Sequence, residues 1–123
     1  MNTTKISTTL FLALLGFTAS FSAQADDLKK VTGLKTPESA ISAKDGRVFV
    51  SEIGEFGKDG DGQITVIDKN GEVRVFAKGL DDPKGLAFVG KDLFVADNHR
   101  VLKVSPKGDV HVFAAAQAFP EQP

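Results

Sequence analysis

Residues 58–64, with the sequence KDGDGQI, are of types that could bind a metal ion. The segment contains the pattern Asp-x-Asp-Gly-x-Ile, which occurs in calcium-binding loops. An EF-hand loop also needs Asp at its first position and Glu at its twelfth, and helices on both sides. The chain has Gly57 and Asp68 at those two positions, and no helical pattern flanks them. We therefore interpret the segment as a flexible hairpin loop, with Asp59 and Asp61 as the ligands if calcium does bind.

His99 and His111 are the only two histidines of the chain. His99 belongs to the sequence ADNHR, which predicts a turn between two strands, and no Ser or Cys stands in a nucleophilic arrangement with it. His111 alternates with Val110 and Val112, a pattern that predicts a solvent-facing position in a strand. Neither histidine is assigned a catalytic role.

Composition narrows the class of protein. The chain has 15 basic and 16 acidic residues and a net charge of −1, which argues against nucleic acid as a partner. The acidic pairs Asp26-Asp27 and Asp81-Asp82 are interpreted as solvated loop charge. There is no Cys, which excludes disulfides and a lipoprotein anchor. Ten Phe supply all the aromatic residues.

Residues 1–25 have the three parts of a secretory signal peptide. A short polar start that contains Lys5 is followed by the apolar run LFLALLGF and then by SAQA, with small residues at Ala23 and Ala25. A membrane span is the alternative, but it needs about 20 apolar residues. We expect cleavage after Ala25, a periplasmic or secreted protein, and no membrane anchor after cleavage.

The rest of the chain repeats itself. Residues 36–52, TPESAISAKDGRVFVSE, match residues 82–97, DPKGLAFVGKDLFVAD. Residues 63–80 then match residues 100–117 at a constant offset of 37. Pro37 and Pro83 are 46 residues apart, and most of the excess lies in the loop GEFGKDGDG, residues 54–62. A period of this length indicates a repeat architecture.

Each unit contains four short segments rich in β-branched and aromatic residues, separated by turns such as Asp45-Gly46 and Asn70-Gly71. This pattern predicts an all-β fold made of two four-stranded antiparallel β-propeller blades. A small eight-stranded sandwich is the alternative, but it does not explain the repeat. Blade 1 is expected over about residues 33–78 and blade 2 over 79–114, with a third unit starting over 115–123. The expected strands are 39–43, 47–52, 63–67, 72–77, 85–88, 92–96, 100–104 and 109–113.

The sequence PKGLAFVGKDLFVADNHRVLKVSPKGDVHVFA, residues 83–114, resembles an NHL-type blade. The sequence PESAISAKDGRVFVSEIG, residues 37–54, resembles the first blade of the six-bladed gluconolactonase-like propellers, which include the senescence marker protein. The resemblance covers about residues 33–113. It implies that the chain is the N-terminal part of an incomplete propeller, either a fragment or a chain that completes a ring by self-association through its open blade faces.

In the lactonase-like members of this family, a divalent metal of the calcium or zinc class lies at one mouth of the central channel. The resemblance implies that Glu38, which follows Pro37, is a metal ligand, although it is also interpretable as a solvated carboxylate. Lys84 occupies the matching position of the second unit and cannot bind a cation. Glu121 follows Pro120 in the same way and is a second candidate ligand.

Two functions follow from the resemblance. The first is a metal-dependent hydrolase of a lactone or sugar-type ester, of which this chain alone is inactive because the remaining ligands lie outside it. The second is a non-catalytic NHL-type scaffold that binds a protein or small ligand.

Overall fold

The computed structural model describes residues 29–120. The predicted signal peptide at residues 1–25, the Asp26-Asp27 pair and the candidate ligand Glu121 lie outside the described residues. Within residues 29–120, no helix is long and apolar enough to cross a membrane.

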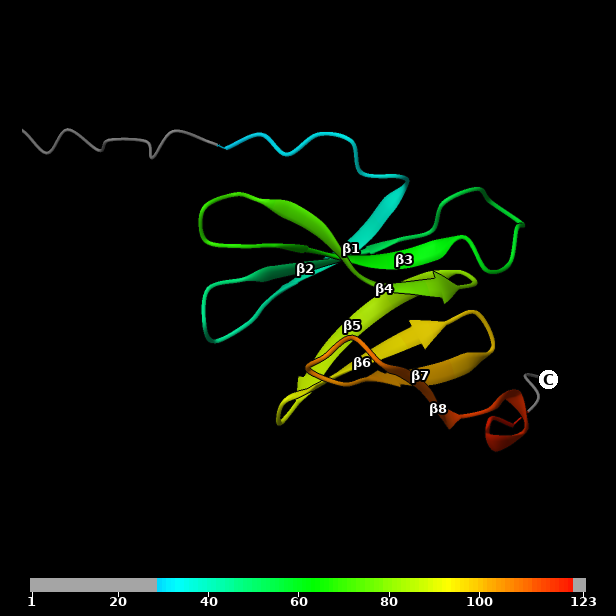
Figure 1. The fold of residues 1–123 in the computed structure, drawn as a ribbon. Coiled ribbons are helices and arrows are strands. Elements are labelled where there is room, and N and C mark those ends of the chain that lie inside the picture. Colours follow the sequence, from blue (N-terminus) through cyan, green and yellow to red (C-terminus); the bar gives the residue numbers. More distant parts are fainter. Residues whose placement is uncertain (1–28, 121–123) are drawn as a thin grey trace, which may run out of the picture.

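The described chain is all-β and forms two four-stranded antiparallel sheets (Figure 1). Each sheet is an up-and-down meander, because its four strands are neighbours in the order in which they occur along the chain. This is the strand order of a propeller blade. The first sheet comprises β1 (Pro37–Ser42), β2 (Val48–Glu52), β3 (Gly62–Ile67) and β4 (Val73–Leu80). The second comprises β5 (Pro83–Val89), β6 (Asp92–Asp97), β7 (Arg100–Val104) and β8 (Val110–Ala114).

All eight strands lie where the sequence pattern predicts them, and the fold class is confirmed. The main difference is the end of β4, which continues to Leu80 instead of ending at Ala77. The register shifts inside the β3–β4 pair, and after the shift Lys78 and Leu80 pair with Gln63 and Gly62. A bulge interrupts the alternation of side chains, so the pattern by itself did not show that the strand continues.

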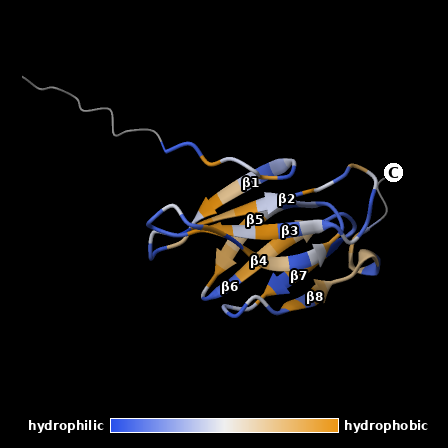
Figure 2. Ribbon diagram, turned by 45° about the horizontal axis from the view of Figure 1, so that its top comes forward, coloured by the Kyte–Doolittle hydropathy of each residue, from blue (hydrophilic) through white to orange (hydrophobic). Residues whose placement is uncertain are grey.

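The hydrophobic core lies between the two sheets (Figure 2). Alternation along each strand directs every second side chain to this layer. At its centre the ring of Phe49 makes edge-to-face contacts with Phe76, at a centroid distance of 4.9 Å, and with Phe88, at 5.4 Å. The other buried members are Ile64, Val66, Ala77, Leu80, Leu93, Val95, Leu102 and Val104.

The sheets meet along the first strand of each unit. Strand β5 lies against β1, β2 and β3. The hydroxyl of Ser51 donates a hydrogen bond of 2.8 Å across the interface to the carbonyl oxygen of Lys84. The outer strands carry exposed side chains, including Val75 on β4 and Phe113 on β8. First strands in contact and outer strands exposed are the arrangement of neighbouring propeller blades around an axis.

The last described segment was predicted to begin a third unit. Over residues 115–120 the structure shows a short 3-10 helix, Ala116–Ala118, followed by Phe119 and Pro120 in extended conformation or coil.

Candidate functional site

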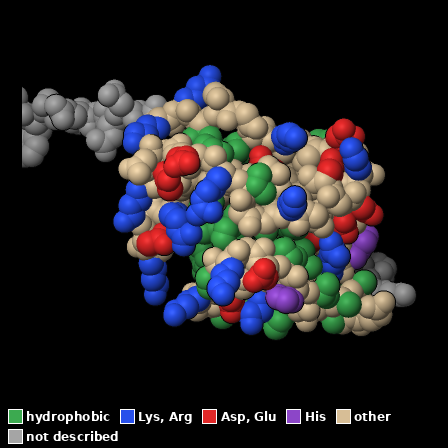
Figure 3. Space-filling model, in the orientation of Figure 1, with side chains coloured by type: hydrophobic (Ala, Val, Ile, Leu, Met, Phe, Trp, Pro, Cys, Tyr) green, Lys and Arg blue, Asp and Glu red, His purple; other side chains and the backbone are tan. Residues whose placement is uncertain are grey.

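The polar and charged side chains described below lie at one end of the two sheets, which we call the loop end. It is formed by the starts of β1 and β5, the loop of residues 54–61, the linker Asp81-Asp82 and the turn Asn98-His99 between β6 and β7. Figure 3 shows acidic side chains and a histidine close together at the right-hand edge of the molecule. The opposite end of the described sheets carries four further hairpin turns, β1–β2, β3–β4, β5–β6 and β7–β8.

Asp97, the last residue of β6, is fully buried at the loop end. Its carboxylate accepts hydrogen bonds from the backbone N–H groups of Asp81, at 3.0 and 3.2 Å, and of Asp82, at 2.8 Å. It also pairs with Arg100 at the start of β7, through Nε at 3.0 Å and Nη2 at 2.9 Å. The carboxylate therefore holds the linker that joins the two sheets.

Glu52 has the same role in the first sheet. It ends β2, is 1% exposed, and accepts a hydrogen bond of 3.0 Å from the backbone N–H of Lys35. Its second oxygen accepts from Gln63 Nε2 and from the hydroxyl of Thr65, both at 2.9 Å. Gln63 is the repeat equivalent of Arg100. We call this recurring contact between a buried acid and the preceding linker the carboxylate latch.

The pattern of strands and turns does not reveal the carboxylate latch. A signal for it was present in the sequence Gly-Leu-x-x-Pro, which occurs at residues 33–37 and again at residues 79–83. Gly33 and Gly79 have nearly the same positive φ, 83° and 81°, which favours glycine at both places. Extending the repeat four residues upstream of each proline would have revealed this linker.

Asp81 and Asp82 were interpreted as solvated loop charge, and this was wrong. Both are only partly exposed, and their backbone N–H groups bind Asp97. The side chain of Asp81 pairs with Arg100 at 3.2 Å and accepts a hydrogen bond of 3.0 Å from the backbone N–H of Gly60. The linker is thus fixed by both sheets.

Asp61 closes the loop of residues 54–61 on itself. Its carboxylate accepts a hydrogen bond of 3.0 Å from the backbone N–H of Glu55 and lies 4.0 Å from Lys58 Nζ. Asp59 lies in a different part of the loop and borders a hollow beside Arg100. Over residues 29–120, no group of three or more His, Asp or Glu side chains is placed to hold a metal ion.

Glu38 lies at a β-bulge at the start of β1, between the pairs Pro37–Glu52 and Ser39–Ser51, and it is exposed. Lys84 lies in the corresponding bulge of β5 and pairs with Asp82 at 3.5 Å. The structure thus places Glu38 on the strand at the contact between the sheets, but brings no further ligands to it among the described residues. One exposed carboxylate is too few ligands for a metal site, so the metal that the resemblance implies would need further ligands from outside the described residues.

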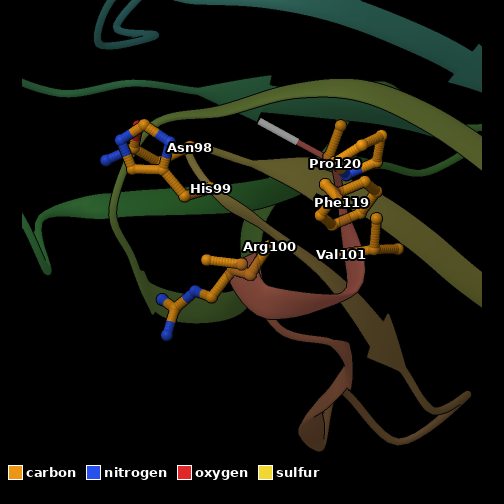
Figure 4. A pocket seen from close by; sticks show the side chains of 8 residues that line it. Asn98, His99, Arg100, Val101, Phe119 and Pro120 are labelled. Atoms are coloured by element: carbon orange, nitrogen blue, oxygen red, sulfur yellow. The ribbon is translucent and has the colours of Figure 1, made fainter. Parts of the chain in front are cut away.

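A hollow surrounds the β6–β7 turn (Figure 4). Asn98, in the left-handed region with φ 48°, turns the chain, and His99 and Arg100 follow it. One part, of about 480 Å³, is bordered by these three residues together with Phe119, Pro120 and the apolar residues Ala96, Val101 and Ala116. An adjoining part, of about 420 Å³, shares the three residues and adds Asp59 and Asp81. His111 borders neither part.

The fold and the carboxylate latch define an all-β protein of two propeller-like blades. No protein-family model matches the chain, and no curated protein is detectably similar to it in sequence.

Proposed function

We propose that the chain supplies two neighbouring blades of an exported propeller of the gluconolactonase-like type, and that its loop end binds a small polar ligand of the lactone or sugar class. The observation that carries the proposal is the hollow around Asn98, His99 and Arg100, which lies where two sheets, their linker and the C-terminal segment meet. Small-molecule sites are typically concave surfaces with a few convergent polar groups.

The lining suits a polyhydroxylated ligand. Asp59 and Asp81 supply acceptors for hydroxyl groups, and Asn98 and His99 supply both donors and acceptors. The guanidinium of Arg100 is held in place by Asp97 and Asp81, and its side chain is 32% exposed. A positioned donor group loses little freedom on binding, which favours affinity. Phe119 adds an apolar surface at the rim, against which the carbon face of a sugar ring can pack.

Binding is tested by titrating the full chain with an aldonolactone, the matching aldonic acid and the matching aldose, followed by NMR shifts or calorimetry. The exposed residue His99 is changed to Ala, with His111→Ala as the matched control. We expect His99→Ala to weaken binding about tenfold, as for a lost hydrogen bond to a polar ligand, and His111→Ala to leave it unchanged. Equal affinity of wild type and His99→Ala would reject the site, and binding of none of the three probes would reject the ligand class.

A metal-dependent lactonase is the second candidate, and the position of Glu38 on the first strand of its sheet favours it. The direct test is lactone hydrolysis with and without EDTA. Glu38→Gln is compared with Glu55→Gln, which changes another exposed carboxylate at the loop end. Turnover that needs metal and is lost only in Glu38→Gln would establish the enzyme. We expect no such turnover from this chain by itself.

A further inference from the structure

The second sheet has one face in the core and one that is open. Besides Lys103, which pairs with Asp92 at 3.3 Å, the open face carries the apolar residues Ala87, Phe94, Val101 and Phe113. In the repeat these positions match Ile41, Phe49, Ile64 and Phe76 of the first sheet, which all belong to the core between the sheets or pack against it. The open face therefore repeats a surface that is covered in the same molecule.

The aromatic pair of that surface is reproduced in detail. Phe49 and Phe76 lie 4.9 Å apart at an interplanar angle of 81°, and Phe94 and Phe113 lie 4.9 Å apart at 87°. In the first sheet, Phe88 from the neighbouring sheet packs on this pair. On the open face, Phe113 remains 65% exposed. An exposed aromatic pair in this geometry is suited to packing against another sheet.

The face of the second sheet that covers the first sheet in the core also has an equivalent, on the outer side of the first sheet. The face of the first sheet that points away from the core carries the exposed Ala40 and, beside it on β2 and β3, Val50 and Thr65, which are only 5% and 3% exposed. Their equivalents in the second sheet are Leu86, Val95 and Leu102, which face the first sheet in the core. We call this side of the first sheet the receiving face. Leu34, which precedes it, matches the buried Leu80.

We propose that the open face of one copy binds the receiving face of a second copy, head to tail, and so repeats between copies the interface that exists within one copy. The contact is heterologous, because the two surfaces differ. Its apolar centre is smaller than that of the internal interface, since Ala40 replaces Leu86 and Ala87 replaces Ile41. It is also more polar, since Thr65 replaces Leu102 and Lys103 replaces Val66. We therefore expect weak, concentration-dependent association. The proposal does not depend on the ligand.

The test uses sedimentation velocity of the full chain over a series of protein concentrations. Two exposed residues are changed, Ala87→Glu on the open face and Ala40→Glu on the receiving face. Each variant should raise the dissociation constant by at least about tenfold, because a buried unpaired carboxylate is costly. Phe56→Glu, in a loop and 80% exposed, is the control for added charge and should associate like wild type. Far-UV circular dichroism checks that all variants fold.

A mixture of the two face variants gives the decisive result. Each variant keeps one intact surface, so an equimolar mixture should form a one-to-one dimer that neither variant forms alone. If Ala40→Glu still dimerises alone and the mixture adds nothing, the contact joins two open faces and the head-to-tail proposal is wrong. A wild-type chain that stays monomeric at every concentration would also overturn it, and would assign the open face to a further sheet of a longer polypeptide.

Discussion

Glu52 and Asp97 occupy the same place in two successive sheets, and each buried carboxylate binds the backbone of the linker that precedes its own sheet. The contacts join residues 17 positions apart in the first unit and 15 to 16 apart in the second. The partners differ, since Glu52 is paired with the neutral groups of Gln63 and Thr65, whereas Asp97 is paired with the cation of Arg100.

The latch of the second sheet is expected to contribute more to stability than that of the first. Asp97→Asn should lower the free energy of unfolding by about 3 kcal/mol, because it leaves Arg100 without its buried partner. Glu52→Gln should lower it by about 1 to 2 kcal/mol, because its partners are neutral. Urea denaturation measures both, with the exposed Asp59→Asn as the control within about 0.5 kcal/mol of wild type. Equal losses in the two latch variants would contradict this ranking.

Gly62 lies so close to the linker that we expect a larger side chain at this position to lower stability. A Cβ atom at Gly62 would lie 2.6 Å from Pro83 Cδ and 2.9 Å from the carbonyl oxygen of Leu80. Gly62→Ala should therefore destabilise the protein by about 1 to 3 kcal/mol, as overpacking does. At Gly85 the nearest atom, Ala96 Cβ, is 3.8 Å away, so Gly85→Ala should be neutral or slightly stabilising. Similar denaturation midpoints for the two variants would argue against the tight contact.

The hydrogen bonds of Asp45, in the β1–β2 turn, predict that stability depends on pH. The hydrogen bond from the backbone N–H of Arg47, at 3.0 Å, holds the pKa of the Asp45 carboxyl below its ordinary value, and the guanidinium of Arg47, at 2.9 Å, lowers it further. A lowered folded-state pKa means that the ionised Asp45 carboxyl stabilises the folded protein at pH values above its ordinary pKa. This stabilisation is lost as the pH falls through the folded-state value.

Carbon-13 NMR titration of the Asp45 carboxyl tests the cause of this shift. Arg47→Ala removes the guanidinium and keeps the backbone N–H, which is the larger cause. The pKa should therefore return only part of the way toward its ordinary value. A complete return would assign the shift to the charge of Arg47 alone.

Phe119 predicts an effect on self-association. It borders the hollow beside Ala96 and Val101, at one end of the second sheet's open face, and is 48% exposed. In the repeat, residues 115–120 match residues 78–83, which hold the linker before β5. In the proposed assembly the second copy's linker before β1 would take this place, so residues 115–120 would compete with it. Phe119→Ser should loosen the segment and lower the dissociation constant severalfold in sedimentation velocity. Weaker association would show that Phe119 belongs to the contact instead of competing with it.

The positions of all eight strands could be predicted because alternation and turn residues are local properties. The sequence also showed the repeat, which indicated blades. The ends of β4 and β1 were less well predicted, because bulges at Phe76 and Glu38 change the register without changing the composition.

The amino-acid sequence by itself determined the strands, their order and their pairing into two similar units, because every hairpin except β2–β3 is closed by a short turn and each strand has one apolar side. Only the tertiary structure decided which acidic side chains form buried contacts. Asp81 lies 16 residues before Asp97, and it joins the network of Asp97 and Arg100 only after the second sheet has folded back against its linker. The same folding left Glu38 exposed, since a ligand set depends on several strands converging and no single position can specify it.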